Sequence, residues 1–325
     1  MTHEEQIATE PVVVTAPASV NFLKSLWEQV GPGHLAWDFS RSNQVIAPGD
    51  RSMEVKAGVL KTLKLKEAGL AGELKIDGAG ELDWLTLQGN RLTAVEFKNL
   101  PKLVGFQIID EHLTTLTFGG GLGRLYGEAV VVAANLARLV VKGRNRLTEL
   151  YIRASRLEDI SPLRRLKNLL ALTIKSELLS DLSPLEGLSF SFVLGLDSPL
   201  VSDLKPLGKL KYVSELRLIS DKITDLRPLV KLKDRLYALD VNSNSLTDLA
   251  PLAQLKKLGV LGLVGDALTD LSPLAGLTSL WDLVLEGKNL TDLSPLAKVE
   301  DGLSWYLVNN CQLKGEPCKT NSEKT

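Results

Sequence analysis

Seven aspartates are the residues whose type and spacing come nearest to a chemical function. Each lies three residues before a proline, and these prolines, from Pro162 to Pro295, follow one another at intervals of 22, 22, 22, 23, 22 and 22 residues. Carboxylates that gather on one surface can bind a metal ion or serve as acid and base. An acid that recurs once per repeat is better explained by structural bonding, because it can accept free backbone N–H groups at the next turn or favour the positive start of a helix. The seven are Asp159, Asp181, Asp203, Asp225, Asp248, Asp270 and Asp292.

The other residues capable of chemistry do not form a catalytic or metal-binding set. His3, His34 and His112 are scattered, without a His or Cys at metal-ligand spacing, and His112 is predicted to be a surface residue. Cys311 and Cys318 could join in an oxidising compartment, but we interpret them as two free thiols of a cytosolic protein. The glycine-rich FGGGLGRLYG lacks the spacing of a phosphate-binding loop and predicts a bend or a distorted coil. We therefore expect no enzyme, no metal and no cofactor.

Composition excludes further classes of function. Lys and Arg number 38 against 39 Asp and Glu in 325 residues, which leaves no basic excess for nucleic acid. No apolar run approaches the roughly 18 residues that cross a bilayer, so we expect no membrane span. The first residues carry acids where a secretory signal is basic, and we therefore expect a cytoplasmic protein.

The repeat itself is written most clearly from Leu268 to Leu296, as LTDLSPLAGLTSLWDLVLEGKNLTDLSPL. A fixed period in the low twenties with the pattern LxxLxL is typical of a leucine-rich-repeat solenoid. LWDLVL predicts a short strand with Leu283 and Leu285 pointing inward and the residues between them outward. SPL predicts a short helical turn, with Ser272 or Ser294 as the N-cap and the proline as the first helical residue.

The first half of the chain carries a looser repeat. LKTLKL, LDWLTL and LVGFQI begin at Leu60, Leu82 and Leu103, at spacings of 22 and 21 residues, and LTAVEF and LTTLTF lie half a period out of phase. We therefore predict strands on both sides of each coil here, without the helical turn. The predicted organisation is a leader and N-terminal cap over 1–50 with an amphipathic helix at 20–30, irregular repeats over 51–146, regular repeats over 147–313 and a polar tail over 314–325.

The series LxxLxLxxxxLxDLSPLxxL resembles the 22-residue leucine-rich repeats of bacterial internalins and of the phosphatase-regulating subunit of eukaryotes. The match covers 147–313, about half of the chain. It implies a curved solenoid with a parallel concave sheet that binds proteins. Together with the spacing, the predicted fold is an α/β leucine-rich-repeat solenoid with short helical or 3-10 turns on the convex side in the C-terminal half and more β-rich, irregular repeats in the N-terminal half. The position that often holds a ladder asparagine in these families departs from the pattern, being Ser155, Glu177, Pro199, Asp221, Asn244, Asp266, Lys288 and Cys311.

Strand alternation selects the residues that the last coils display on the concave side. Apolar side chains on a solvent face with an acidic border predict a partner-binding patch. The open alternative is that the tail folds back over them, or that they are ordinary strand formers. The predicted partner-binding residues are Val260, Val264, Asp282, Val284, Glu286, Trp305 and Leu307.

Basic residues recur on the opposite side, shortly after the prolines. We interpret them as a solvated convex face, rather than as a site for an anionic ligand. They are Arg165, Lys167, Lys209, Lys211, Lys231, Lys233 and Lys256.

These observations predict a non-enzymatic, protein-binding solenoid, of bacterial type and monomeric. It would act as a scaffold, regulator or inhibitor that grips a partner protein on its concave face, and a bacterial immunity protein is one specific version. The alternative is a structural or surface-associated adhesion protein that acts by self-association.

Overall fold

The computed structural model describes residues 45–46, 51–56, 59–67, 70–124, 129–186, 188, 193–300, 302–303 and 305–309. The chain divides into two compact units, Met1–Leu157 and Glu158–Thr325. The predicted helix at 20–30, the tail at 314–325, His3, His34 and both cysteines lie outside the described residues, as do the side chains of Trp305 and Leu307.

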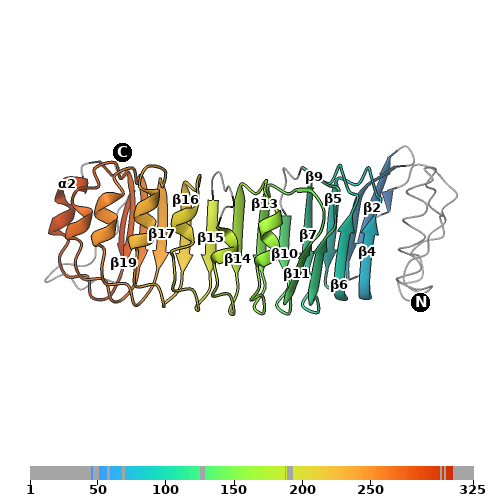
Figure 1. Ribbon diagram of the computed structural model, residues 1–325, viewed down its shortest axis with the longest axis horizontal. Helices are drawn as coiled ribbons and strands as arrows, with labels where there is room; N and C mark the ends of the chain where they lie inside the picture. Colours follow the sequence, from blue (N-terminus) through green and yellow to red (C-terminus); the bar gives the residue numbers. More distant parts are fainter. Residues whose placement is uncertain are drawn as a thin grey trace, which may run out of the picture. The chain divides into compact units, whose positions relative to one another are not determined.

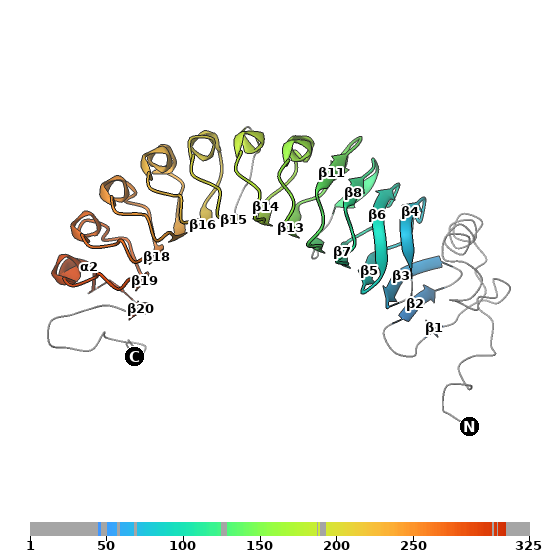
Figure 2. The same ribbon diagram turned by 90° about the horizontal axis from the view of Figure 1, so that it is seen from below.

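The first unit is built from two sheets whose strands alternate along the chain (Figures 1 and 2). Strands β1 to β3 pair antiparallel, and the pairings from β3 onward are parallel. The first sheet has the order β1 (Val45–Ile46), β2 (Arg51–Lys56), β3 (Val59–Lys66), β5 (Trp84–Gln88), β7 (Gly105–Ile109), β10 (Ala129–Val132) and β13 (Glu149–Arg153). The second sheet has the order β11 (Arg138–Val141), β8 (Thr115–Phe118), β6 (Arg91–Lys98) and β4 (Ala71–Asp77), and β9 (Leu122–Arg124) pairs with β12 (Asn145–Arg146).

Three phenylalanines fill the space between these two sheets. Phe97 and Phe118 come from the second sheet and Phe106 from the first, and all three are fully buried. Their ring centroids lie 5.2 Å (Phe97–Phe106), 6.4 Å (Phe97–Phe118) and 6.0 Å (Phe106–Phe118) apart, distances at which aromatic pairs attract beyond their burial alone. The prediction of strands on both sides of each coil in this half is confirmed.

The second unit repeats one strand and one short turn per coil. Figure 2 shows its strands along the inner side of a curve and its turns along the outer side. The strands are β14 (Ala171–Lys175), β15 (Val193–Asp197), β16 (Glu215–Ile219), β17 (Ala238–Asn242), β18 (Val260–Val264), β19 (Asp282–Glu286) and β20 (Trp305–Asn309), paired in that order and all parallel. The turns are 3-10 helices, η1 (Ser161–Arg165), η2 (Ser183–Leu185), η3 (Leu207–Lys209), η4 (Arg227–Leu232), η5 (Ala250–Gln254), η6 (Ser272–Leu274) and η7 (Ser294–Leu296), the last followed by α2 (Ala297–Glu300).

Strand register places equivalent leucines beside one another from coil to coil. Leu216 pairs with Leu239, Leu239 with Leu261 and Leu261 with Leu283, and each of the four is at most 2% exposed. Because side chains alternate along a strand, the intervening residues face the opposite, solvent side. The core of this unit is therefore a continuous stack of leucines behind a displayed surface.

The seven recurring aspartates make the backbone bond that the sequence predicted for them. In each coil the Oδ1 atom accepts the backbone N–H of the residue two positions later, at 2.7–2.9 Å. The prediction of a serine N-cap is wrong, because Leu271 and Leu293 occupy the cap positions without a side-chain bond, and Ser272 and Ser294 are the first helical residues. Asp270 and Asp292 accept the backbone N–H of these first helical residues, so the helical turn starts one residue earlier than the cap prediction implied.

A buried serine ladder joins neighbouring coils, one residue before the predicted ladder position. Ser198 Oγ donates to the carbonyl of Leu179 at 2.6 Å. Ser220 and Ser243 make the equivalent bonds to Val201 and Ile223, at 2.7 and 2.8 Å. The serines lie one position before the site at which an asparagine ladder was expected.

The expected ladder position itself forms a second, exposed ladder of mixed residue types. Asp221 Oδ1 accepts the backbone N–H of Asn244 at 2.9 Å, and Asn244 Oδ1 accepts that of Asp266 at 3.1 Å. Asp266 Oδ1 in turn accepts the N–H of Lys288 at 3.4 Å. An acceptor oxygen is the common requirement, which Asp and Asn both meet.

We expect Asp248→Ala to destabilise the second unit by about 1 kcal/mol, the usual scale for loss of a capping bond, because Asp248 Oδ1 holds the N–H of Ala250 at 2.8 Å. Asp248→Asn keeps an acceptor oxygen and should cost less. Asp234→Ala, at an exposed residue of the η4–β17 connection, is the control. Denaturant melts of the three variants measure the difference, and equal losses for Asp248→Ala and Asp248→Asn would contradict a bonding role.

Candidate functional site

The inner surface of the second unit is arranged in three rows, because the strands pair without slipping. Leu239, Leu261 and Leu283 point into the core at 0–1% exposure. On each of their strands, the residues that alternate with the buried ones are half-buried on the opposite face. The predicted inward and outward assignment is confirmed for these strands. The rows on β16 to β19 are Glu215, Ala238, Val260 and Asp282; Arg217, Asp240, Gly262 and Val284; and Ile219, Asn242, Val264 and Glu286.

The structure brings together the five predicted partner-binding residues whose side chains it describes. Val260 and Val264 lie on β18, and Asp282, Val284 and Glu286 on β19, all outward and half-buried. Backbone register then continues the rows onto β20, where Trp305 follows Asp282 and Leu307 follows Val284. The predicted patch is thus contiguous in register over three neighbouring strands.

An exposed aromatic pair, not predicted from the sequence, borders this patch. Tyr237 and Trp281 directly precede β17 and β19 and are 46% and 42% exposed. Trp281 Nε1 donates to Tyr237 Oη at 2.5 Å, so the two side chains bridge the intervening coil. The backbone fixes both residues, because Tyr237 N–H donates to Ser214 O at 2.8 Å and Trp281 N–H to Gly259 O at 2.9 Å. Their shared place just before a strand, two coils apart, was the available sequence signal.

Gly259 makes the aromatic bridge possible. A Cβ at this position would lie 2.6 Å from Tyr237 Cε2 and 2.8 Å from Trp281 Nε1. A second glycine in the same coil, Gly262, lies under Asp240, with 2.8 Å between an added Cβ and Asp240 Oδ1. The coil of β18 therefore leaves room at two places for side chains of its neighbours.

The acids on the inner surface differ physically from those in the outer turns. Burial raises the pKa of Asp282, and burial also raises that of Asp240, against an opposing effect of Arg217. Asp282 Oδ1 is buried without a hydrogen-bond partner in the described part of the structure. In the turns, side-chain hydrogen bonds from Ser272 and Ser294 lower the pKa of Asp270 and Asp292. The turn acids are stabilised by their bonds, whereas the inner acids are ionised at a cost in stability.

Charge on the inner surface of the second unit is balanced on its early strands and acidic on its late ones. Lys175 pairs with Asp197 at 2.5 Å, and Arg217 Nε lies 3.2 Å from Asp240 Oδ2. The outward residues of β17, β18 and β19 include three acids, Asp240, Asp282 and Glu286, and no base. The aromatic pair and the valines are therefore flanked by negative charge.

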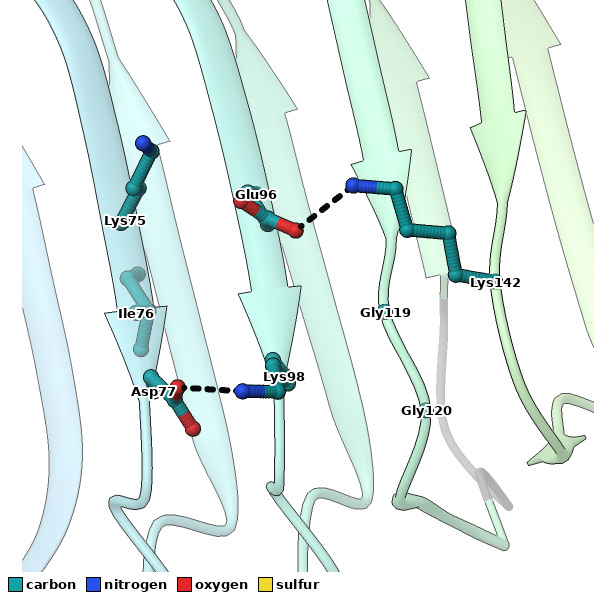
Figure 3. A pocket seen from close by; sticks show the side chains of 8 residues that line it. All are labelled: Lys75, Ile76, Asp77, Glu96, Lys98, Gly119, Gly120 and Lys142. Carbon is teal, nitrogen blue, oxygen red and sulfur yellow. Dashed lines mark hydrogen bonds and ion pairs between the residues drawn. The ribbon is translucent and has the colours of Figure 1, made fainter.

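A pocket of about 380 Å³ lies on the second sheet of the first unit (Figure 3). Its charged groups are already matched, since Lys98 Nζ lies 3.0 Å from Asp77 Oδ2 and Lys142 Nζ 3.4 Å from Glu96 Oε1. The lining holds no His, Cys, Ser or Thr that could act as nucleophile or base; it consists of Lys75, Ile76, Asp77, Glu96, Lys98, Gly119, Gly120 and Lys142. The pocket is thus lined mainly by charged side chains, and its two acids are each paired with a lysine.

The remaining predictions concern His112, the basic residues of the turns, metal binding and membrane spans. The side chain of His112 is 55% exposed and lies beside Asp110, which agrees with its predicted surface position. The predicted basic residues of the turns are exposed, and Lys209 is paired with Glu186 at 2.8 Å. Among the described residues, no group of His, Cys, Asp or Glu could hold a metal ion. In the same residues, no helix has both the length and the apolar character needed to cross a membrane.

Repeating coils, a parallel inner sheet and 3-10 turns define the second unit, the first unit consists of β-rich coils, and the chain is a leucine-rich-repeat solenoid. No protein-family model and no curated protein matches the sequence. Among solved structures, the chain is similar to internalin C2 of Listeria monocytogenes (29% identity, 48% of this chain and 69% of that one, TM-score 0.42). It is also similar to the internalin InlF of the same organism (22%, 74% and 74%, 0.44) and to a leucine-rich-repeat protein of Leptospira interrogans (16%, 74% and 84%, 0.37).

We expect Gly259→Ala to break the hydrogen bond between Trp281 and Tyr237, because the added methyl group occupies the space that both rings use. The indole N–H resonance of Trp281, assigned by its loss in Trp281→Phe, should shift in a ¹H–¹⁵N spectrum, as it should in Tyr237→Phe. Gly276→Ala is the matched control, since its methyl group meets only the flexible end of Lys256. An unchanged resonance in Gly259→Ala would show that the pair does not depend on this glycine.

We expect Asp282→Asn to raise the melting temperature at neutral pH. Since the pKa of Asp282 is raised in the folded state, the folded protein binds more protons than the unfolded chain between the ordinary aspartate pKa and the raised value. Stability therefore falls as pH rises through that window, and the ionised group opposes folding above it. Melts of the variant and the wild type should differ at neutral pH and converge below the ordinary aspartate pKa. Glu177→Gln, an exposed acid in the turn after β14, should show no such difference.

Proposed function

We propose that the protein is a non-enzymatic binding module that holds a partner protein on the inner surface of its second unit. The patch consists of Val260, Val264, Asp282, Val284, Glu286, Trp305 and Leu307, as predicted, extended by Tyr237 and Trp281. The bridged, exposed aromatic pair is the observation that carries the proposal. Aromatic anchors beside aliphatic residues, ringed by charge, are the usual composition of an interface centre.

The stability cost of the inner acids supports the same assignment. Asp282 keeps a desolvated carboxylate oxygen without a partner in the described part of the structure, although asparagine would fill the same volume. A group that opposes folding is explained by a role outside folding, and functional residues commonly carry such a cost. The half-buried valines beside it supply apolar surface that an interface would cover.

The finer parts of the proposal concern the kind of binder. We propose a bacterial, cytoplasmic, monomeric scaffold or regulator that needs no cofactor, with an inhibitor or immunity protein as its most specific form. The exposed basic residues of the outer turns fit a solvated face, because part of their charge is already paired, as in Lys209 with Glu186. Self-association through the inner surface is the competing function, and the experiment below separates the two.

A photo-crosslinking amino acid placed at Val284 should trap a single partner protein in a lysate of the source cells, whereas the same group at Lys231 in the outer turn η4 should trap none. Mass spectrometry of the adduct identifies the partner and the attached peptide. An adduct of the chain with itself would favour self-association. Crosslinking from Lys231 but not from Val284 would move the interface to the outer side and contradict the proposal.

With that partner purified, Trp281→Ala and Trp305→Ala should each weaken binding by about 2 kcal/mol or more, the scale of an interface hot spot. Trp281→Ala should change the melting temperature little, because its ring is 42% exposed. Tyr212→Ala, at a 57% exposed residue outside the patch, is the control. Full affinity in both tryptophan variants would place the binding energy elsewhere.

A further inference from the structure

The late strands of the second unit display acids that their own side of the sheet does not neutralise. Of the three acids on β17 to β19, only Asp240 has a cation within ion-pair distance in the described structure, Arg217 at 3.2 Å. Asp282 and Glu286 lie four residues apart on the same face of β19, with Val284 between them. The register neighbours on β20 are Trp305 and Asn309, which carry no charge.

Aromatic and aliphatic surface adjoins this charge. Trp281 directly precedes Asp282 in the chain, and its ring is held in place by the bond to Tyr237. Val260 is the register neighbour of Asp282 on one side, and Val284 follows two residues later on the same face. One small area thus offers an aromatic face, aliphatic groups and a desolvated carboxylate.

This combination matches one kind of side chain. A guanidinium group stacks on aromatic faces, lays its aliphatic stem on apolar surface and carries a positive charge to a neighbouring carboxylate. Because Asp282 Oδ1 is itself buried, a partner acts on this carboxylate through its charge. A neutral side chain would not offset that charge, and an acidic one would be repelled by three carboxylates. Lysine offers the charge but not the planar group that stacks on an aromatic face.

We propose that the inner surface around β17 to β19 recognises an arginine-bearing segment of the partner protein. The arginine side chain stacks against the Trp281–Tyr237 pair, and its positive charge lies beside the carboxylate of Asp282. Asp240 and Glu286 attract the segment as it approaches. This proposal rests on the proposed function and adds the chemical class of the partner. Binding should also lower the pKa of Asp282, since a cation favours the ionised carboxylate.

The direct test uses short peptides that alternate glycine with arginine, with citrulline or with glutamate. Citrulline has the shape of arginine without its charge, so it separates charge recognition from stacking. The indole N–H resonance of Trp281 reports binding in a ¹H–¹⁵N titration. We expect a saturable shift with the arginine peptide, about tenfold weaker binding of the citrulline peptide, the scale of one charged contact, and no shift with the glutamate peptide.

Two variants make the result specific. Asp282→Asn keeps the reporter tryptophan and should weaken the arginine peptide about tenfold, whereas Glu177→Gln makes the same charge change in the turn after β14 and should leave it unaltered. Equal binding of the arginine and citrulline peptides, no saturable shift, or full binding in Asp282→Asn would overturn the proposal.

Binding of the crosslinked partner to Asp282→Asn distinguishes failure of the arginine proposal from failure of the proposed function. A partner that attaches at Val284 but binds Asp282→Asn with unchanged affinity would leave the binding function standing and remove its arginine specificity. Attachment at Lys231 alone would remove both. A self-adduct at Val284 would mean that the occupant is a second copy of this chain, and it would also overturn the proposal of a separate partner.

Discussion

The parallel pairing of one coil with the next is the constraint on which the rest of the second unit depends. Each strand is hydrogen-bonded to its neighbours, so a residue's place within the repeat decides both its depth and its row. Leucines at one phase must stack in the core, and the residues between them must face out. The serine ladder and the turn aspartates support this pairing because they bond backbone C=O and N–H groups that have no partner within a short coil.

The same constraint turns single residues into surfaces. Tyr237 and Trp281 belong to coils that are not adjacent, yet they meet because the coil between them carries Gly259 at that phase. A side chain at Gly259 would separate the rings, and one at Gly262 would displace Asp240. Glycine therefore leaves space for side chains of the neighbouring coils. The residue types that vary from coil to coil determine what the inner surface can bind.

Acids in this protein have two roles that the environment separates. Asp270 in the outer turn accepts bonds from Ser272 that lower its pKa, so its charge favours folding. Asp282 on the inner surface is desolvated without that compensation, and its charge opposes folding. The turn aspartate recurs in every coil, whereas the row of Asp282 holds Glu215, Ala238 and Val260 in the preceding coils. The local bonding then gives the two carboxylates opposite effects on folding.

The sequence by itself determined the period, the strand phase and the inward leucines, because these follow from spacing alone. It also determined the bonding role of the recurring aspartates and the two-sided strands of the first unit. Only the tertiary structure decided that Leu271 rather than Ser272 is the cap, that the buried ladder runs through Ser220, and that Trp281 meets Tyr237. The cap depends on the bonds that the turn's own backbone makes, and the other two features depend on which groups lie close together in different coils. A linear pattern records residue types but not these distances.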